Sequence, residues 1–516
     1  MAKKKPSNNT SSRRSSKVNV DRLPVWSAPQ AQTESIDNFE SPEDLALPMT
    51  TGRMLASVPS SGAEAFQTTL REVQGKCGMK DICHSHDFDG AMDLNQADQA
   101  EIAIFDDLSV AVLSTADPDQ ERALVRASRS SGLILEAERW NYSQDGFEED
   151  LIPREPERFD PGSLETQLDY LKGYRDGITK VIRKLEEREQ HESFQGGFQE
   201  AANFFDSSDA TWGLQATGVL GTMLSGTGTK IAVLDSGVHM GHPDIQSREI
   251  PIATETFIPD RVLDRFRNVI TLDDTNADSD VSGHGTHCIG TAAGTKTPLS
   301  GARYGVASGA EVFSAKVLSV IPGQTRAAGT DQWIMAGMEA AIKRGCNIIS
   351  MSLGSRVARG VGHSTSYQKI ARDALNRGIL IFAAAGNDSR RDAFRPRILP
   401  VSSPANCPSI LAVGAVVSQT SASGVHRLAP FTNRFLNTGG GEVNFCAPGF
   451  NVLSSHVSSQ IKKLSGTRQA TPHVTGIAAL VREDKNLDGL PLFHELVKRS
   501  KKQGHFDDYG RGLIHV

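Results

Sequence analysis

Two short segments place an acid and an imidazole where they could transfer protons. The apolar run 230–234 is typical of a buried parallel strand and ends at Asp235. Acids at the carboxyl ends of such strands lie where α/β sheets build their sites, although an Asp before Ser-Gly is also a common turn residue. The segment 283–287, GHGTH, brings His284 and His287 within three residues. Such a pair could ligate a metal, but the HExxH signature is absent.

A third segment has the form of a nucleophile turn with one residue out of place. Residues 463–476 read KLSGTRQATPHVTG and resemble the turn S-G-T-S-M-A-T-P-H-V-x-G of the subtilisin-like serine peptidases, whose second Ser attacks the peptide carbonyl. Arg468 stands at the position of that Ser. Its guanidinium stays protonated near neutral pH and offers only donors, so it cannot attack a carbonyl. Ser465 is no substitute, because the family's turn already carries a Ser there.

Further blocks resemble the same family in the same order across 205–516 (235–244, 283–287, 347–354, 379–387 and 447–449). The resemblance implies an α/β fold with a subtilisin-like parallel sheet flanked by helices. It also implies that His284 is the general base, that Asp235 orients it, and that Asn387 supplies the oxyanion-hole amide.

The strand-like block NIISMSLG implies how a substrate would bind. In the family, the residues that correspond to Ser352, Leu353 and Gly354 pair with the substrate backbone and line the first specificity pocket, a case of strand addition. The implied partner is therefore a polypeptide substrate or a peptide ligand.

Arg468 decides the predicted activity. Loss of the nucleophile costs about 10⁶-fold in kcat in this mechanism. The side chain should enter the space of the scissile carbonyl and either pair with Asp235 or hold His284 neutral by charge repulsion. The sequence thus predicts an inactive subtilase fold, as a pseudopeptidase or a loss-of-function form of a serine endopeptidase. The alternative is a peptide-binding, scaffolding or regulatory protein, but retention of Asp235, His284 and Asn387 favours a recent loss.

Residues from about 50 to 145 read as a separate α+β unit. The pattern predicts, in order, a strand, a helix, two strands joined as a hairpin, a helix and a strand (53–58, 63–74, 102–105, 108–113, 118–130 and 133–137). This is the ferredoxin-like order. Placed before a subtilase-like segment, the unit resembles the family's prodomain, a folding chaperone and inhibitor whose tail lies in the cleft. An unrelated small domain is the alternative. An active enzyme would cut the unit off and leave a product that begins between 140 and 210.

The remaining segments carry no recognisable chemistry. Residues 1–48 are Ser-rich and basic, which favours a disordered tail over a nucleic-acid or membrane tether. The pattern of residues 160–195 predicts an amphipathic helix and linker, with the clearest helical period at 163–190. That helix either packs on its own chain or forms an oligomerisation seam, and 195–208 read as a linker.

The net charge and the distribution of apolar residues limit which partners and which cellular compartment are expected. A net charge of −6 gives no general attraction to nucleic acid. The sequence contains no run of 18 apolar residues, so no membrane span is predicted. The basic start lacks an apolar signal region, which favours the cytoplasm over secretion.

No cofactor is predicted. The six cysteines form no CxxC pair. Cys77 and Cys83 lie near His84 and His86, a group that fits ordinary loop residues better than a metal site. Subtilases often bind calcium, but no acidic loop here is specific enough to assign a calcium site.

Overall fold

A computed structural model describes most of the chain beyond residue 49. The described residues are 50–58, 62–115, 118–143, 204–263, 268–324, 326–393, 396–421, 424–437 and 439–516. The predicted tail 1–48, the predicted helix 163–190 and most of the predicted linker 195–208 lie outside them.

The N-terminal unit has the predicted order of elements, with short elements added between its first helix and its hairpin. Its elements are β1 (Thr50–Ser57), α1 (Ala63–Cys77), β2 (Ile82–His84), η3 (Ser85–Asp87), α2 (Leu94–Ala97), β3 (Ile102–Phe105), β4 (Val110–Leu113), α3 (Pro118–Ser131) and β5 (Ile134–Tyr142). The strands lie in the order β5-β1-β4-β3-β2, and all neighbours except β2 and β3 are antiparallel. The hairpin turn occupies 106–109, so β4 begins two residues later than predicted.

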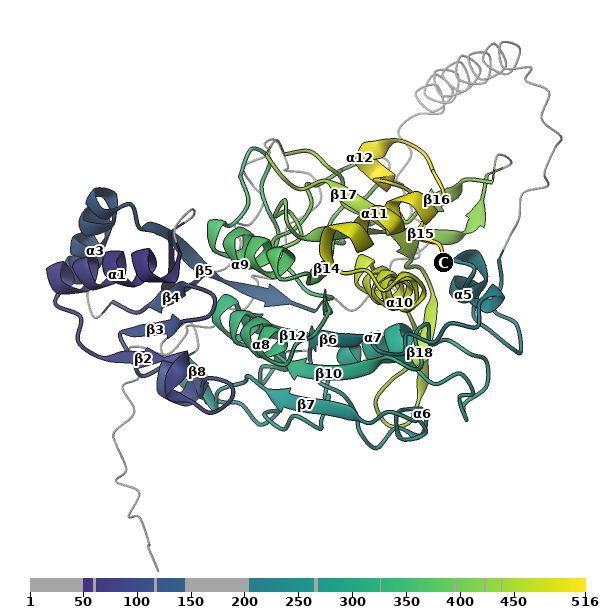
Figure 1. Ribbon diagram of the computed structural model, residues 1–516, viewed down its shortest axis with the longest axis horizontal. Helices are drawn as coiled ribbons and strands as arrows, with labels where there is room; N and C mark the ends of the chain where they lie inside the picture. Colours follow the sequence, from purple (N-terminus) through teal and green to yellow (C-terminus); the bar gives the residue numbers. More distant parts are fainter. Residues whose placement is uncertain are drawn as a thin grey trace, which may run out of the picture.

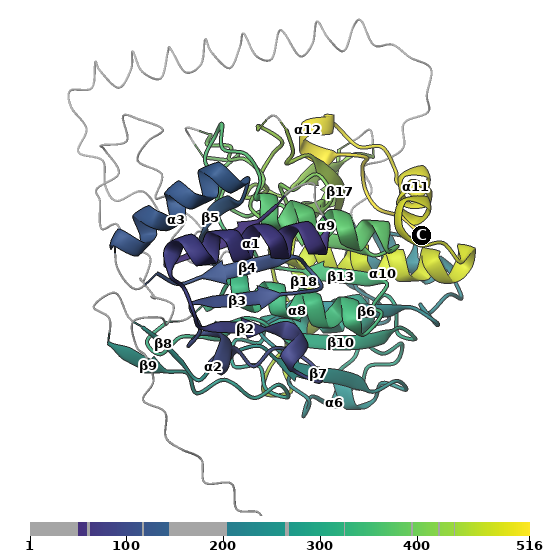
Figure 2. The ribbon, with the colours of Figure 1, turned by 60° about the vertical axis from the view of Figure 1, so that its left-hand side comes forward.

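This sheet is covered on both faces. Phe66, Leu70 and Val73 of α1 are buried, as their spacing predicts, and pack with α3 on one face. Side chains of the other face, such as Val110, join a core that includes Trp333 of the C-terminal unit. Figure 2 shows α1 in front of the strands of this sheet.

The C-terminal unit is built on a mostly parallel sheet. Its helices are α5 (Trp212–Ala216), η5 (Val219–Gly221), α6 (Pro243–Gln246), α7 (His284–Ala293), α8 (Asp331–Lys343), α9 (Thr365–Asn376), α10 (Thr467–Lys485), α11 (Gly489–Arg499) and α12 (Phe506–Tyr509). Its strands are β6 (Lys230–Asp235), β7 (Ile252–Thr256), β8 (Arg261–Leu263), β9 (Val269–Thr271), β10 (Glu311–Lys316), β11 (Ser319–Val320), β12 (Ala327–Thr330), β13 (Ile348–Met351), β14 (Leu380–Ala384), β15 (Leu411–Thr420), β16 (His426–Leu428), β17 (Val443–Pro448), β18 (Val452–Ser455) and β19 (Ile461–Leu464). The main sheet has the order β16-β15-β14-β13-β6-β10-β7, and β17 also pairs with β15.

Helices cover both faces of the main sheet, because its strands are apolar on both sides. In β6, Ile231 and Val233 belong to the core formed with α7 and α10, whereas Ala232 and Leu234 belong to the core formed with α8 and α9. The α/β fold predicted from the sequence is therefore present. None of the described helices is long and apolar enough to cross a bilayer.

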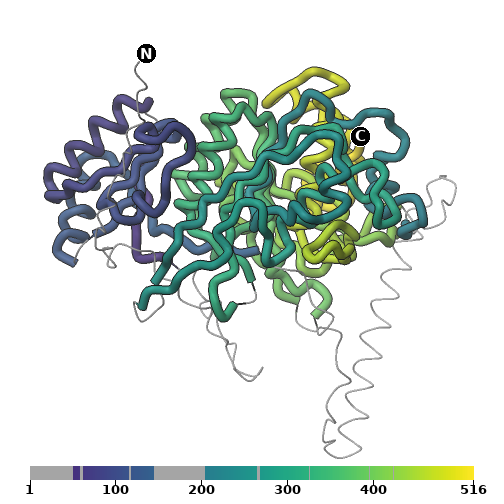
Figure 3. The backbone as a smooth tube through the Cα atoms, turned by 90° about the horizontal axis from the view of Figure 1, so that it is seen from below, coloured from purple at the N-terminus to yellow at the C-terminus, as the bar shows by residue number. Residues whose placement is uncertain are grey.

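The two units are joined through β5. This strand leaves the N-terminal sheet and pairs antiparallel with β12, matching Trp140 with Thr330 and Tyr142 with Ala328. The Trp140 and Trp333 rings meet edge to face, with centroids 5.6 Å apart. In Figure 1 the arrow of β5 runs from the N-terminal unit into the C-terminal unit, and Figure 3 shows the N-terminal unit at one end of the molecule.

Candidate active site

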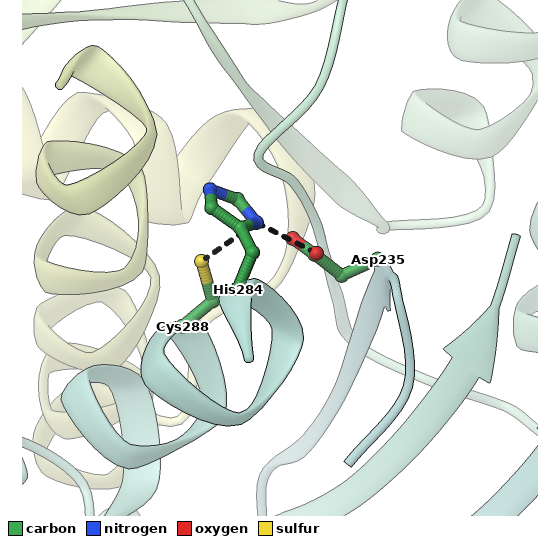
Figure 4. A group of neighbouring side chains, drawn as sticks. All are labelled: Asp235, His284 and Cys288. Carbon is green, nitrogen blue, oxygen red and sulfur yellow. Dashed lines mark hydrogen bonds and ion pairs between the residues drawn. The ribbon is translucent and has the colours of Figure 1, made fainter. Parts of the chain in front are cut away.

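Asp235 and His284 form a buried pair where a strand end meets a helix start. Asp235 is the last residue of β6 and His284 the first of α7. His284 Nδ1 lies 2.7 Å from Asp235 Oδ1, and both residues are buried (Figure 4). Burial alone would lower the pKa of His284, but Asp235 raises it well above its usual value, with a contribution from Cys288. The imidazole is thus oriented through Nδ1, and Nε2 remains for another group.

The backbone at this junction leaves no room for a side chain. A Cβ on Gly285 would lie 2.2 Å from the carbonyl oxygen of Gly237, the second residue after Asp235. The glycine therefore lets α7 approach the end of β6 closely enough for His284 to reach Asp235.

We expect Gly285→Ala to lower the free energy of unfolding by about 1–3 kcal/mol, because the added methyl overpacks against backbone. Gly75→Ala is the matched control: Gly75 is also helical, in α1, and has nothing within 4 Å of its added Cβ. There the change should stabilise by up to about 1 kcal/mol through helix propensity. Chemical denaturation measures both, and equal effects would contradict the close-approach explanation.

A second buried acid supports the pair and was not singled out in the sequence. The Asp280 carboxylate accepts hydrogen bonds from the Gly283 and Thr286 amides, both at 2.8 Å, and from Ser236 Oγ at 2.9 Å. The Ser236 amide in turn donates to Asp235 Oδ1 at 2.8 Å. Asp280 therefore connects the loop after β6 to the start of α7. An acid just before a helix start was the available signal.

Asn387 is oriented by the turn that carries position 468. Its Oδ1 accepts hydrogen bonds from the amide and the hydroxyl of Thr467, both at 2.8 Å. Because a backbone amide can only donate, the oxygen of the Asn387 side chain must face Thr467. The NH2 group is then directed elsewhere, and it lies beside Gly466, where a Cβ would come within 2.7 Å of Nδ2.

Arg468 lies in the first turn of α10 with 3% of its surface exposed. Its carbonyl oxygen accepts a hydrogen bond from Ser352 Oγ at 2.8 Å and lies 3.7 Å from Cys288 Sγ. Cys288 Sγ is also 3.8 Å from His284 Nδ1. Asp235, His284, Asn387 and Arg468 therefore converge on one place, although they are far apart in the sequence.

The charge of Arg468 acts on a carboxylate that the sequence did not single out. This is Asp388, which is buried next to Asn387. Burial raises the pKa of Asp388, but Arg356, with Nε 2.5 Å from Oδ1, and Arg468 bring it below its usual value. The expected charge repulsion would lower the pKa of His284, whereas the Asp235 carboxylate holds that pKa above its usual value. The sequence could not reveal this, since it does not show which way a long side chain turns.

Ser352, Leu353 and Gly354 follow β13, and the chain itself occupies the edge that they present. Gly354 and Tyr142 exchange two backbone hydrogen bonds, at 3.2 and 3.4 Å. The Ser143 amide donates to the Ala327 carbonyl at 2.9 Å. The end of β5 therefore lies as a strand between β12 and the segment 352–354.

A model of the subtilase family matches residues 226–500, just over half of the chain. The chain belongs to the subtilase family. Subtilisin E of Bacillus subtilis (strain 168) is 31% identical over 293 residues, which cover 57% of this subtilase and 65% of that protein. The chain thus spans less than two thirds of the length of that relative.

Two other proteins are similar to this chain. The Major intracellular serine protease of Bacillus subtilis (strain 168) is 31% identical over 54% of this chain and 77% of its own length. The solved structure of Sphericase has 28% sequence identity and a TM-score of 0.49, covering 60% of this chain and 99% of its own.

Proposed function

We propose that this subtilase is a pseudopeptidase: a serine endopeptidase scaffold that keeps its general base, the acid that orients it and its oxyanion amide, and lacks the nucleophile. The observation that carries this proposal is the position of Arg468 in the first turn of α10. The preceding residue, Thr467, binds Asn387, and the Cys288 thiol contacts both the Arg468 carbonyl and His284. The purified chain should therefore not turn over a general peptide substrate. Turnover that disappears in a His284→Ala variant would overturn the proposal.

The chemistry that is missing is the first step of acyl transfer. In this family's mechanism a hydroxyl at position 468 would pass its proton to His284 Nε2 and attack the peptide carbonyl, while the Asn387 NH2 stabilises the oxyanion. A guanidinium has no electron pair to donate and no proton that an imidazole can remove near neutral pH. Arg468 therefore removes the first step of the reaction by its chemistry.

We also propose that the N-terminal unit is the prodomain of this subtilase and occupies its substrate channel. Support comes from β5, whose end pairs with Gly354 and Ala327, the two edges between which an extended peptide would bind. The same contact supports a polypeptide as the natural ligand, because the channel accepts an extended strand through backbone hydrogen bonds.

Two acids of β5 lie at the starts of the helices that the N-terminal unit covers. Glu138 accepts a hydrogen bond from the Gln332 amide in α8 at 3.0 Å, and Glu136 accepts one from the Thr365 amide in α9 at 2.5 Å. Carboxylates at helix N-termini satisfy free amides and interact favourably with the helix dipole. These contacts support a role of the unit in folding the two helices.

The joint between the units should respond to pH through Asp331. This buried acid at the start of α8 accepts hydrogen bonds from the Arg139 amide at 2.8 Å and from Asn141 Nδ2 at 2.7 Å. Burial raises its pKa from 3.8 to about 6, even though Arg139 and Asn141 lower it. Since the folded protein then binds the proton more tightly than the unfolded chain, stability should fall as pH rises from about 4 to about 6 and level off above.

Asp331→Asn should therefore flatten that fall in the unfolding temperature between pH 4 and 6. The exposed acid Asp119 gives the matched control, and Asp119→Asn should leave the slope unchanged. Burial also raises the pKa values of Asp98, Asp280 and Glu339, and these acids contribute to the slope that remains. An unchanged slope in Asp331→Asn would contradict the assignment.

A peptide-binding role on the same scaffold is the second candidate. The pairing of β5 with Gly354 favours it, since strand addition needs no nucleophile. Competition by free peptides for the channel would support this role. The cytoplasmic location expected from the sequence stays a prediction.

A further inference from the structure

An open groove with exposed apolar side chains lies beside the C-terminus, outside the candidate active site. It has a volume of about 870 Å³ and is lined by residues of α5 and η5 and of the C-terminal ends of α10 and α11. Leu220 is 46% exposed and Met223 is 90% exposed. Asp484 and Arg499, which form an ion pair, also line the groove. Exposed apolar groups that are surrounded by polar residues are typical of interaction sites.

The apolar surface of the groove continues into the core of the C-terminal unit. Leu224 and Val516, which line the groove, are partly buried and pack against the core formed with α7 and α10. The Val516 amide donates to the Thr217 carbonyl at 3.1 Å, which holds the C-terminus next to α5 (Figure 1). An apolar segment bound in the groove would therefore extend an existing core.

The chain itself leads to this groove. The described residues resume at 204, and the Phe205 carbonyl accepts a hydrogen bond from Gln215 Nε2 at 2.7 Å. Gln215 lines the groove, and the side chain of Phe205 is 67% exposed. The residues that precede 204 in the sequence are thus connected directly to the edge of the groove.

The sequence before 204 supplies an apolar face of suitable length. Within the predicted helix 163–190, four apolar residues follow at spacings of four, three and four and so share one face: Tyr174, Ile178, Val181 and Leu185. Residues 191–203 can span up to about 40 Å, which is twice the length of a helix over 174–185. A segment tethered by a short linker is present at an effective concentration of about 1 mM, which favours it over a second copy of the chain.

We propose that this groove is the docking site for residues 174–185 of the same chain, whose apolar face covers Leu220 and Met223. The docked segment fixes the connection between the two units to the surface beside the C-terminus. Residues 144–173 then span the distance from the end of β5 to the groove. The amphipathic pattern of 163–190 thereby has its partner in its own chain, and an oligomerisation seam is not needed to explain it.

Hydrogen exchange of the full chain, measured by mass spectrometry, tests the docking. An isolated helix of about 12 residues is marginal in water, so slow exchange of 174–185 would report contact with another surface. We expect these amides to exchange at least about 10-fold more slowly than those of an unfolded chain. Exchange at the unfolded rate would overturn the proposal. Protection that increases with protein concentration would overturn it too, because it would assign the partner to a second copy.

A variant in the groove shows where the segment binds. Met223→Lys should raise the exchange rate of 174–185 by about 10-fold or more, since burial of one large apolar side chain is worth at least that factor. Leu299→Lys is the matched control, because Leu299 is 75% exposed and does not line the groove. The high exposure of Met223 means that its substitution should leave folding intact. Equal exchange of 174–185 in the two variants would contradict the assignment.

The reciprocal variant changes the proposed occupant. Ile178→Asp should raise the exchange rate of residues 218–224 in the groove, because it places a charge on the docking face. Thr179→Asp adds the same charge on the opposite side of the predicted helix and should leave that rate unchanged. If neither variant alters exchange at 218–224, residues 174–185 do not cover the groove.

Discussion

Arg468→Ser is expected to turn one stable chain into two fragments. The substitution places a hydroxyl where His284 Nε2 and the Asn387 amide can act on it, and the loss that it reverses is worth about 10⁶-fold in kcat, or roughly 8 kcal/mol of barrier. Because the end of β5 pairs with Gly354, at the edge proposed above to bind substrate, the first bond to be cut should lie within a few residues after Ser143. Mass spectrometry of the purified variant measures the fragments, and a peptide substrate measures the turnover.

Two controls separate chemistry from steric relief. Arg468→Ala removes the guanidinium but supplies no hydroxyl, so it should remain whole. The double variant Arg468→Ser with His284→Ala keeps the hydroxyl but lacks the base, and it should remain whole as well. If Arg468→Ser folds but is neither cut nor active, a simple loss of the nucleophile does not explain this protein.

Asp388→Asn is expected to lower the free energy of unfolding by about 1–3 kcal/mol, because the carboxylate is buried and accepts charged donors, while its ion-pair partner Arg356 is 47% exposed and screened by solvent. Asp388 is 8% exposed and faces the charges of Arg356 and Arg468. The low pKa of Asp388 sets the direction with pH: its stabilising charge is present above the ordinary pKa of an aspartate and is lost as pH falls through the folded value.

A double-mutant cycle assigns part of that cost to Arg468. Once Arg468→Ser has removed the buried cation, Asp388→Asn should cost less than it does in the unmodified chain, by roughly 0.5–3 kcal/mol. Denaturant titrations of the four proteins give the coupling. A coupling of zero would mean that Arg356 alone balances Asp388 and that the Arg468 side chain is held by other contacts.

Much of the fold was predictable because its signals are local. The period of Phe66, Leu70 and Val73 and the continuous apolar run of β6 depend only on neighbouring residues. The sequence placed the end of the last strand of the N-terminal unit at 137, whereas β5 continues to Tyr142. Its final residues pair with β12, which lies nearly 200 positions away, so no local pattern could reveal them.

The features of the site also divide into those with a local sequence signal and those that depend on packing. Asp235, His284, Asn387 and Arg468 were found because each sits in a short motif, and the structure brings them together. The partner of Arg468 was missed because the direction of its side chain depends on packing between β14, α10 and the loop of Arg356. The support that Asp280 gives to the pair of Asp235 and His284 becomes visible only when the start of α7 meets the loop after β6.

The most direct test of the proposal that the nucleophile is missing is the intact mass of the unmodified chain after purification. The arginine at position 468 predicts a single species of 55.6 kDa that stays whole on prolonged incubation. A shortened product that begins soon after Ser143 would contradict it, provided that the His284→Ala variant, purified in parallel, remains whole.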